Sequence, residues 1–591
     1  MTNSYKLTDN SEERNFLFWL GKEYIFEIPL YQRIYKWKAD KQIESLKQDF
    51  DEIIDGQKIM HFFGAIIIEP LPKRMEDPER YEIIDGQQRM TTVFFFVMAA
   101  IYQIRRVDEE KAVKLFKRFL IIRDKEIENC KFQPSIEDRA QINWIFANII
   151  TKDFKVKLEN EQASYREFKV EDNSKTNGRA REAYTSFKRY IELKIKNLDD
   201  KDKSKEIEKI LEKILSASSV VSLVIKEKQY GPIIFDKLNA GQEKITTSEL
   251  VKNFIFGRIS KEGNSGEVVQ QFHDIHWKDF DKQFKDGKSA ENYFFPFALI
   301  GVPSIRKEEV YRSITNIWQK KEFTSEQIIE NLKEYQPAFN ALQNGKVSQY
   351  NKKIGSVISN LHTIKLSITT YPFVMQVIRK VEVDDNFEST ALNILNFLKA
   401  FYVRRALCDR EPTGLHAVFK NLWITLSERE DFSSKAILEI INQSHSSQKP
   451  PNDKELTEGI KTVKLANKKI CNFVLEQFDK SFKGEYPECP NRNVEHVLPV
   501  RYTHWKNDFT SEEHEELVNT FANLVFLTDK LNKEVSNKPY FEKRKAILGK
   551  AMFTSTRKLF EENQIWTPNE INKRAEEISE WACKRWECPK V

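Results

Sequence analysis

The sequence predicts a mostly helical α+β protein built from several domains. Three observations lead to this prediction: a length of 591 residues, a β-leaning run that turns abruptly into an apolar helix near residue 86, and helical periodicity over long stretches of the remaining chain. Domains usually contain about 100–200 residues, so a chain of this length should hold more than one hydrophobic core.

The composition is that of a globular protein, with 40% hydrophobic and 31% charged residues. The 95 Lys and Arg exceed the 89 Asp and Glu by a net charge of +6, which permits a nucleic-acid partner without requiring one. The six cysteines are scattered without a C-x-x-C pair, which argues against a disulfide framework and a cysteine-ligated zinc knuckle. The chain lacks an apolar signal core and an apolar run of about 18 residues, so we expect a cytoplasmic protein with no membrane partner.

The first candidate site is the turn that follows the run from Tyr81 to Ile84. This run stops at Asp-Gly, and an apolar helical pattern from Met90 to Met98 begins within a few residues. The unpaired N–H groups and the dipole at the start of such a helix attract anions. The turn also offers a carboxylate, amides, a guanidinium and hydroxyls, from Asp85, Gln87, Gln88, Arg89, Thr91 and Thr92. It therefore predicts a site for a phosphorylated ligand, and the alternative is an ordinary turn with solvated polar side chains.

Aromatic residues surround an arginine and an amide in the segment 24–37. The segment begins with strand-like alternation, and Tyr35 and Trp37 then lie close in sequence to Gln32 and Arg33. Aromatic rings beside an arginine suit stacking on a base or on a partner surface. The alternative is that Tyr35 and Trp37 belong to the core and that Arg33 forms a salt bridge.

Further elements follow from periodicity. Apolar residues from Ile43 to Ile54 recur with helical spacing, with Asp40 as the expected N-cap and Gly56 as the stop signal. The run Phe62–Glu69 predicts a buried strand, and the β-branched run Ser219–Ile225 predicts another strand. The regions at about 100–215 and 258–440 are helical in pattern and carry no motif to which we assign chemistry, and residues 442–453 are polar and proline-broken, as in a linker.

The sequences IPLYQRIYKW and IIDGQQRMTT, separated by a helix and an FFGAIII strand, together resemble the N-terminal domain of GmrSD-type modification-dependent restriction enzymes. That domain is related to the ParB/sulfiredoxin-like fold, and in the family it binds and hydrolyses nucleotides. A later segment, IIFDKLNAGQEKITTSELVKNFIF, resembles the part of the domain that returns to the nucleotide site. Its Thr246-x-x-Glu249 capping box also predicts the start of a helix. The resemblance implies nucleotide contacts from Gln32, Arg33, Asp85, Gly86, Gln87, Gln88, Arg89, Thr91 and Asn239, with Asp85, Gln88 and Arg89 serving hydrolysis.

A second constellation lies near the C-terminus: Glu495-His496 in NVEHVLP, then Asn523, then Asn532. Metal-assisted phosphodiester cleavage needs a base that activates water and a divalent cation that neutralises developing charge. This order resembles the His-Asn-Asn variant of the HNH (ββα-metal) nucleases, in the form that closes GmrSD-like chains. The alternative for His496 is a histidine that is simply hydrogen-bonded on a half-buried strand.

The resemblance implies a role for each C-terminal residue. His496 would be the general base, Asn523 would brace the loop that orients it, and Asn532 would be a metal ligand with Glu495 as a second. Lys543 would contact the phosphate or the transition state. Many HNH enzymes carry histidine at the last position, and the oxygen ligands here suit Mg²⁺ (or Mn²⁺) better than zinc.

These expectations combine into a three-part protein. Residues 1–258 form the nucleotide-binding sensor domain with a helical insertion at about 100–215, residues 259–450 a helical connector, and residues 451–591 the HNH nuclease domain. We expect a nucleotide- and metal-dependent endonuclease of antiphage defence that cleaves or nicks modified double-stranded DNA. The N-terminal domain would hydrolyse NTP, and a homodimer is compatible with this activity. The alternatives are a phosphorothioate-sensing NTPase and nickase, an NTPase sensor subunit with a regulatory role, and a DNA-binding scaffold.

Overall fold

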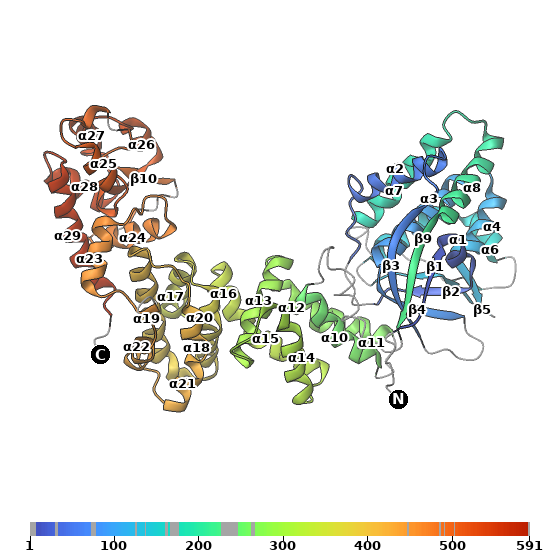
Figure 1. Cartoon of the computed structure of the whole chain (residues 1–591), viewed down its shortest axis with the longest axis horizontal. Helices are drawn as coiled ribbons and strands as arrows, with labels where there is room; N and C mark the ends of the chain where they lie inside the picture. Colours follow the sequence, from blue (N-terminus) through green and yellow to red (C-terminus); the bar gives the residue numbers. More distant parts are fainter. Residues whose placement is uncertain are drawn as a thin grey trace, which may run out of the picture. The chain divides into compact units, whose positions relative to one another are not determined.

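The computed structural model describes residues 8–29, 34–71, 78–124, 127–135, 138–159, 164–165, 177–225, 246–261, 266–445, 448–483, 486–487, 489, 491–501 and 503–588. The chain divides into two compact units, residues 1–274 and 275–591. Helices dominate both units and each contains a sheet (Figure 1), which confirms the prediction of a mostly helical α+β protein. Within these described ranges, no helix is both long enough and apolar enough to cross a membrane.

The N-terminal unit is built on a mixed six-stranded sheet with the order β1-β9-β3-β4-β2-β7. Its strands are β1 (Thr8–Asn15), β2 (Tyr24–Glu27), β3 (His61–Pro70), β4 (Glu79–Asp85), β7 (Phe132–Gln133) and β9 (Ser218–Ile225). The strand β9 pairs antiparallel with β1 and parallel with β3, so it joins the start of the chain to the middle of the sheet. A separate small sheet contains β5 (Ile121–Asp124), β6 (Ile127–Cys130) and β8 (Ser164–Tyr165).

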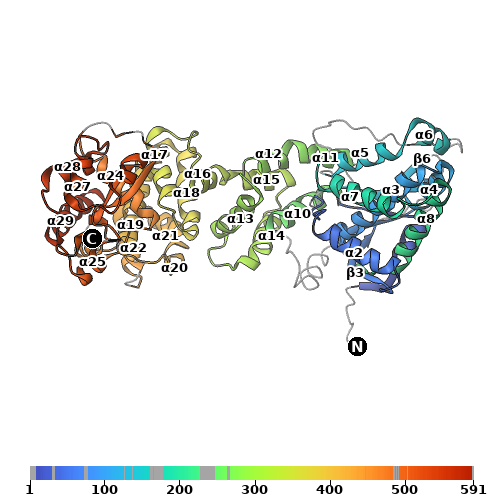
Figure 2. The ribbon, with the colours of Figure 1, turned by 90° about the horizontal axis from the view of Figure 1, so that it is seen from above.

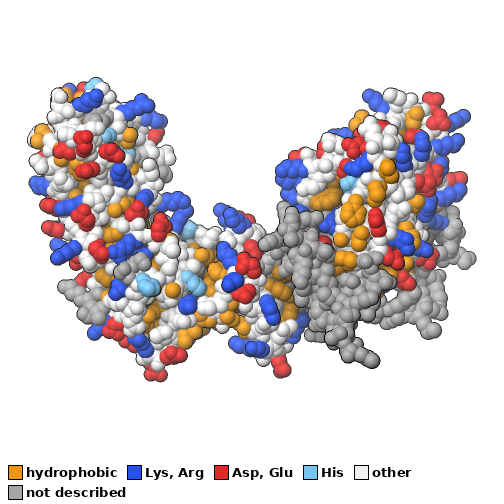
Figure 3. Space-filling view, in the orientation of Figure 1, with side chains coloured by type: hydrophobic (Ala, Val, Ile, Leu, Met, Phe, Trp, Pro, Cys, Tyr) orange, Lys and Arg blue, Asp and Glu red, His pale blue; other side chains and the backbone are white. Residues whose placement is uncertain are grey.

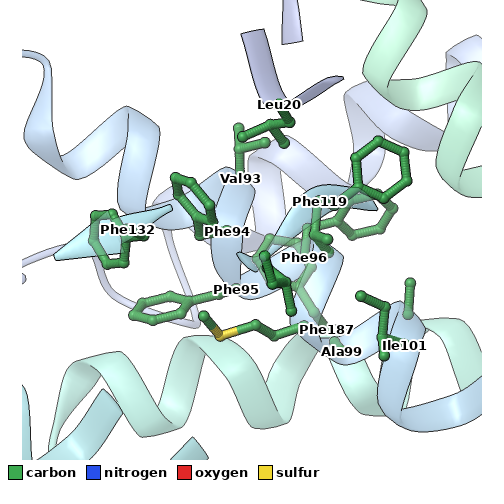
Figure 4. Close-up of a cluster of buried hydrophobic side chains, with 14 of the residues drawn as sticks. Leu20, Val93, Phe94, Phe95, Phe96, Ala99, Ile101, Phe119, Phe132 and Phe187 are labelled. Carbon is green, nitrogen blue, oxygen red and sulfur yellow. The ribbon is translucent and has the colours of Figure 1, made fainter. Parts of the chain in front are cut away.

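Helix α3 (Gln87–Arg105) is the centre of this unit's core. Its side chains are buried on all sides, as expected for a helix that is apolar around its whole circumference. In Figure 4 the rings of Phe94, Phe95 and Phe96 lie among side chains from other elements, including Phe132 and Phe187. The other helices are α1 (Phe16–Gly21), α2 (Gln42–Ile54), α4 (Glu109–Phe119), α5 (Arg139–Ile149), α6 (Lys152–Glu159), α7 (Arg179–Lys194), α8 (Asp200–Ala217), α10 (Thr247–Lys261) and α11 (Gly266–Phe272).

Two local predictions in this unit have different outcomes. The capping box is confirmed, because Glu249 N donates to Thr246 Oγ1 at 3.2 Å and Thr246 N donates to Glu249 Oε2 at 3.0 Å. The N-cap prediction for α2 is wrong: the cap position is Lys41, not Asp40, and it carries no side-chain hydrogen bond. A tight turn places the N–H groups of Lys41 and Ile43 on the carbonyl oxygen of Lys38, so the helix starts from a backbone turn.

The second unit begins with consecutive helices, which Figure 2 shows from a second direction. They are α12 (Lys278–Lys282), α13 (Gly287–Gly301), α14 (Val310–Lys320), α15 (Ser325–Glu334), α16 (Gln336–Asn344), α17 (Lys352–Thr363), α18 (Tyr371–Val383), α19 (Glu388–Leu407), α20 (Leu415–Phe419), α21 (Leu422–Arg429) and α22 (Ser434–Asn442). The last part of the chain contains α23 (Asp453–Thr462), α24 (Lys469–Asp479), β10 (Arg492–His496), α25 (Ser511–Leu517), β11 (Leu524–Thr528), α26 (Asp529–Val535), α27 (Tyr540–Ile547), α28 (Thr554–Glu562) and α29 (Pro568–Arg585).

One apolar core surrounds the hairpin-like pair β10 and β11. It contains the buried side chains of β11 and residues from α23, α24 and α29, and it also includes Ala400, Val403 and Leu407 from α19. Arg404 stabilises the packing of α19 against this core, because its guanidinium donates to the carbonyl oxygens of Trp586 and Pro451 at 2.7 Å each. The end of α19 therefore packs as part of the same body as the strands.

Candidate functional sites

The turn between β4 and α3 requires glycine at position 86. Gly86 has a φ of +90°, in the left-handed region, and a Cβ added there would lie 2.5 Å from Ile66 Cγ2. The chain can therefore pass close to β3 and enter α3 at Gln87 without a steric clash. Gly86 has no side chain that could cap the first N–H groups of α3, and the N-terminus of a helix attracts anions.

Gln88 holds the segment that leads away from Gln32 and Arg33. Its Nε2 donates to the carbonyl oxygen of Ile34 at 3.2 Å, and its Oε1 accepts from Lys36 N at 2.6 Å. Both ends of the amide are thus used to fix a loop, so Gln88 would act on a ligand through the position of that loop. Gln32 and Arg33 themselves lie outside the described residues.

Tyr35 is a core residue rather than part of an aromatic cage. Its side chain is 2% exposed, and its hydroxyl lies 2.7 Å from Thr92 Oγ1, which in turn donates to the carbonyl oxygen of Gln88. Burial raises the pKa of Tyr35 well above its ordinary value. This contact links the segment 34–36 to the first turn of α3.

The polar side chains of the turn are enclosed rather than solvated. The Arg89 guanidinium donates to the carbonyl oxygen of Ala65 on β3, and its Nη2 lies 4.0 Å from Asp85 Oδ2. Gln87 and Thr91 are 6% and 3% exposed, and Gln87 Oε1 has no hydrogen-bond partner within the part of the chain that the structure describes. The structure brings together Asp85, Gly86, Gln87, Gln88, Arg89 and Thr91, whereas Asn239 lies outside the described residues.

The second candidate site is formed by β10, β11 and α26. The two strands are antiparallel, with His496 opposite Leu524 and Glu495 opposite Val525, and α26 follows β11 without a loop. Thr528 caps α26 by accepting a hydrogen bond from Leu531 N at 3.3 Å. This strand, strand, helix arrangement places the start of α26 beside the start of β10, where Asn493 Nδ2 donates to Asp529 Oδ1 at 3.1 Å.

His496 stands at the end of β10 with one ring nitrogen engaged. Its Nε2 lies 3.1 Å from Asn519 Oδ1. Burial lowers the pKa of His496 below the ordinary 6.5; the Asn519 hydrogen bond and the Glu495 charge oppose this shift, whereas Lys543 and His514 add to it. This shift favours the neutral imidazole, which is the form that can accept a proton.

Asn523 fixes the chain immediately after His496. It is fully buried; Leu498 N donates to its Oδ1 at 2.7 Å, and its Nδ2 donates to the carbonyl oxygens of Leu498 and Val518 at 2.8 Å each. Trp566 Nε1 donates to the same Oδ1 at 3.2 Å. With its amide used in this way, Asn523 ties the segment after β10 to the start of β11.

Lys543 lies beneath β10. Its side chain is 1% exposed, and its Nζ lies 2.8 Å from Glu495 Oε1 and 2.7 Å from the carbonyl oxygen of His496. Burial lowers the pKa of Lys543 and the Glu495 charge opposes that shift. The ammonium thus contacts one oxygen of Glu495 and one oxygen of His496 from the buried side of β10. The phosphate contact suggested by the resemblance would require it to leave these partners.

Asn532 contributes a buried amide oxygen to this site. Its Oδ1 is buried and accepts no hydrogen bond from any residue that the structure describes. A buried amide oxygen without a donor is costly unless a cation or water satisfies it. No group of three or more His, Cys, Asp or Glu side chains suited to a metal occurs among the residues searched, which are those described. The amide oxygen of Asn532 and the carboxylate of Glu495 are oxygen donors of the kind that Mg²⁺ binds.

Several residues that support this site were not identified from the sequence. Asn519 contacts His496 directly, and His514 Nε2 lies 3.0 Å from the carbonyl oxygen of Pro499. From α29, Arg574 Nη1 donates to the carbonyl oxygens of Ala522 and Leu524, at 2.5 and 3.0 Å, one on each side of Asn523. No spacing in the sequence connects these positions to His496.

Two family models match the parts of the chain that contain the two candidate sites. The model described as the GmrSD restriction endonuclease N-terminal domain matches residues 16–256, and the model of the GmrSD restriction endonucleases C-terminal domain matches residues 449–581. The turn between β4 and α3 lies in the first match, and β10, β11 and α26 lie in the second. A search of curated proteins found no match.

These matches cover more than half of the chain and define the class of the protein as a DNA restriction endonuclease. The chain belongs to the GmrSD restriction endonuclease family, because it carries both of the family's domains in one polypeptide.

Proposed function

We propose that the protein is a metal- and nucleotide-dependent endonuclease that cleaves modified foreign double-stranded DNA in antiphage defence. The proposal divides the chain into a sensor domain at 1–258, a helical connector at 259–450 and an HNH-type nuclease domain at 451–591. The observation that carries the nuclease assignment is the geometry at the end of β10. His496 is held there by a hydrogen bond to Asn519, and α26 of the same strand, strand, helix unit carries the buried amide oxygen of Asn532, which has no donor among the described residues.

His496 acts as the general base in this proposal. Its neutral imidazole removes a proton from the water that attacks the scissile phosphate, and a base of this kind typically contributes about 10²–10⁴ in rate. Asn523 and Lys543 keep the imidazole in place, because Asn523 binds the main chain of Leu498 and Lys543 binds the carbonyl oxygen of His496 itself. Small displacements of a reacting group can cost about 10²-fold, so this support matters for the rate.

A divalent cation, Mg²⁺ or Mn²⁺, would neutralise the charge that develops on the phosphate and on the leaving oxygen. Asn532 would hold it through Oδ1, and Glu495 would contribute the carboxylate oxygen that is not bonded to Lys543. Amide and carboxylate oxygens are the ligands that these ions prefer.

The turn between β4 and α3 is proposed to bind and hydrolyse a nucleoside triphosphate. The start of α3 would receive phosphate oxygens on its N–H groups, and Arg89 with Asp85 would lie at the same end of the helix. The enclosed amide of Gln87 supports a specific site here over a solvated turn. Arg89→Ala should reduce NTP hydrolysis by at least about 10-fold without unfolding the chain, because it removes a charge-assisted contact to phosphate.

In the full proposal the nucleotide state gates the nuclease, since an ungated nuclease would cut host DNA. Sensing of glucosylated hydroxymethylcytosine and of phosphorothioate backbones both fit this scheme. A cleavage rate that is indifferent to added nucleotide would contradict the gating. NTP hydrolysis without cleavage of any DNA would favour the regulatory sensor instead.

The nuclease assignment is tested with supercoiled plasmid DNA and purified protein in Mg²⁺, in Mn²⁺ and in EDTA. Wild-type protein should nick or linearise susceptible DNA with either metal and not in EDTA, and His496→Ala should lose this activity while keeping NTP hydrolysis. Cleavage by His496→Ala at the wild-type rate would contradict the assignment.

On the face shown in Figure 3, positive and negative side chains are interspersed over both units, which gives a purely electrostatic DNA-binding scaffold little support.

A further inference from the structure

Asn519 is anchored so that its side chain can serve His496. It lies between α25 and the short helical turn Phe521–Asn523. Its carbonyl oxygen accepts hydrogen bonds from Leu465 N at 2.8 Å and from Ala466 N at 3.3 Å, both from the chain that follows α23. The main chain at position 519 is therefore fixed independently of the side chain, whose amide oxygen lies 3.1 Å from His496 Nε2.

An amide oxygen can only accept a hydrogen bond, so the ring nitrogen that faces it must carry the proton. A neutral imidazole has one protonated and one unprotonated nitrogen, and the partner of the first determines which nitrogen is left with a lone pair. Among the residues that the structure describes, no hydrogen bond is made to the other nitrogen, Nδ1.

We infer that Asn519 is a positioning residue that selects the tautomer of His496 with Nε2 protonated, so that Nδ1 accepts the proton from the attacking water. This inference rests on the proposed nuclease function and adds to it a residue outside the His496, Asn523 and Asn532 set. It also identifies the atom of His496 that faces the reaction.

The choice of an amide rather than a carboxylate at position 519 has a chemical consequence. A carboxylate facing Nε2–H would stabilise the imidazolium, whereas a neutral acceptor orients the ring with a weaker effect on its charge. The other charged or titratable groups around the ring are Glu495 on β10, Lys543 on α27 and His514 on α25. Glu495 is already paired with Lys543, so Asn519 supplies an uncharged contact to an imidazole that must be neutral to act as a base.

The test uses the full-length protein labelled with ¹⁵N-histidine, with His496→Ala identifying the resonances of His496. Asn519→Asp and Asn519→Ala are compared with Asn393→Ala, which changes an exposed asparagine on α19. Wild-type His496 should show the chemical shifts of the Nε2–H tautomer. Asn519→Asp should keep the Nε2–H tautomer, because a carboxylate oxygen also accepts a hydrogen bond from Nε2–H. Asn519→Ala should lose the tautomer preference, and Asn393→Ala should match the wild type.

Cleavage kinetics give an independent readout. Asn519→Ala should lower kcat by about 10–100-fold with little change in KM, because the ring is no longer held in its reactive orientation. Asn519→Asp, which keeps an acceptor at the same position, should lose less of kcat than Asn519→Ala. A wild-type kcat in Asn519→Ala would overturn the inference.

The tautomer of His496 measured by nuclear magnetic resonance tests the inference even if the protein does not cleave DNA. An Nδ1–H tautomer in the wild type, or an unchanged tautomer preference in Asn519→Ala, would overturn it whatever the cleavage assay shows. Absence of cleavage by the wild type would count against the proposed function alone. If Asn519→Ala does not fold, Asn519→Leu, which has a similar size and no acceptor, carries the test.

Discussion

Lys543→Met removes the ammonium beneath β10 and keeps the length of the side chain. The lysine side chain is 1% exposed and Glu495 is 16% exposed, so the pair is largely buried. Removing one partner of a buried ion pair typically costs 3–5 kcal/mol because the other charge is left without compensation. Glu495 retains some access to water, which places the expected loss of unfolding free energy in the lower part of that range, at about 3 kcal/mol.

The assay is thermal unfolding of the full chain, followed by circular dichroism. A loss of about 3 kcal/mol should lower the midpoint of the second unit's transition by about 6 °C, at roughly 2 °C per kcal/mol for a large unit. Lys545→Met is the matched control, since Lys545 is exposed on the same helix, α27. The reasoning is refuted if the two variants melt within about 1 °C of each other.

A double variant tests whether the cost comes from the pair itself. Glu495→Gln alone leaves the buried Lys543 ammonium without its counter-ion, and Lys543→Met alone leaves the carboxylate. The double variant removes both charges, so its destabilisation should be smaller than the sum of the two single effects by about 1–3 kcal/mol. Additive effects would mean that the two side chains do not interact.

Three further predictions concern the two sites. Gly86→Ala should destabilise the first unit by roughly 2–4 kcal/mol in thermal unfolding, since it combines a positive φ with a Cβ 2.5 Å from Ile66 Cγ2. The control is Gly56→Ala, which has a φ of +75° and no atom within 4 Å of the added Cβ, and it should be clearly less destabilised. Equal losses of unfolding free energy in the two variants would refute the clash. Because burial lowers the pKa of His496 and only the neutral ring is a base, the acid limb of the kcat profile should have its midpoint below that of an unperturbed histidine; a midpoint above it would contradict this. Asn532→Ala should raise the Mg²⁺ concentration for half-maximal cleavage by about 10–100-fold, and an unchanged metal titration would remove Asn532 from the ligand set.

The sequence was sufficient where the determining residues are neighbours in the chain. The turn at Gly86 and the capping box at Thr246 are encoded within a few residues, and both are present in the structure. The strand β1 was not predicted, because its sequence TDNSEERN lacks β-type alternation. Its conformation comes from pairing with β9, which begins about 200 residues later in the chain. Phe62 was expected in a buried strand but is 54% exposed, since it lies at the start of β3.

The C-terminal site shows the same limit. The positions of His496 and Asn523 followed from a resemblance in residue order, and the structure places them at adjacent strand ends. Asn519, by contrast, contacts His496 only because the chain after α25 folds back against α23. A single asparagine in a polar stretch carries no periodic or spacing signal, so this residue becomes visible only in three dimensions.

The most direct test of the account is cleavage of phage DNA that carries glucosylated hydroxymethylcytosine, beside unmodified DNA of the same sequence. Wild-type protein and His496→Ala are each assayed in Mg²⁺ with and without each nucleoside triphosphate. We predict that the wild-type protein cleaves only the modified DNA, that this cleavage depends on nucleotide, and that His496→Ala does not cleave. Equal cleavage of both DNAs without nucleotide, or full activity in His496→Ala, would contradict it.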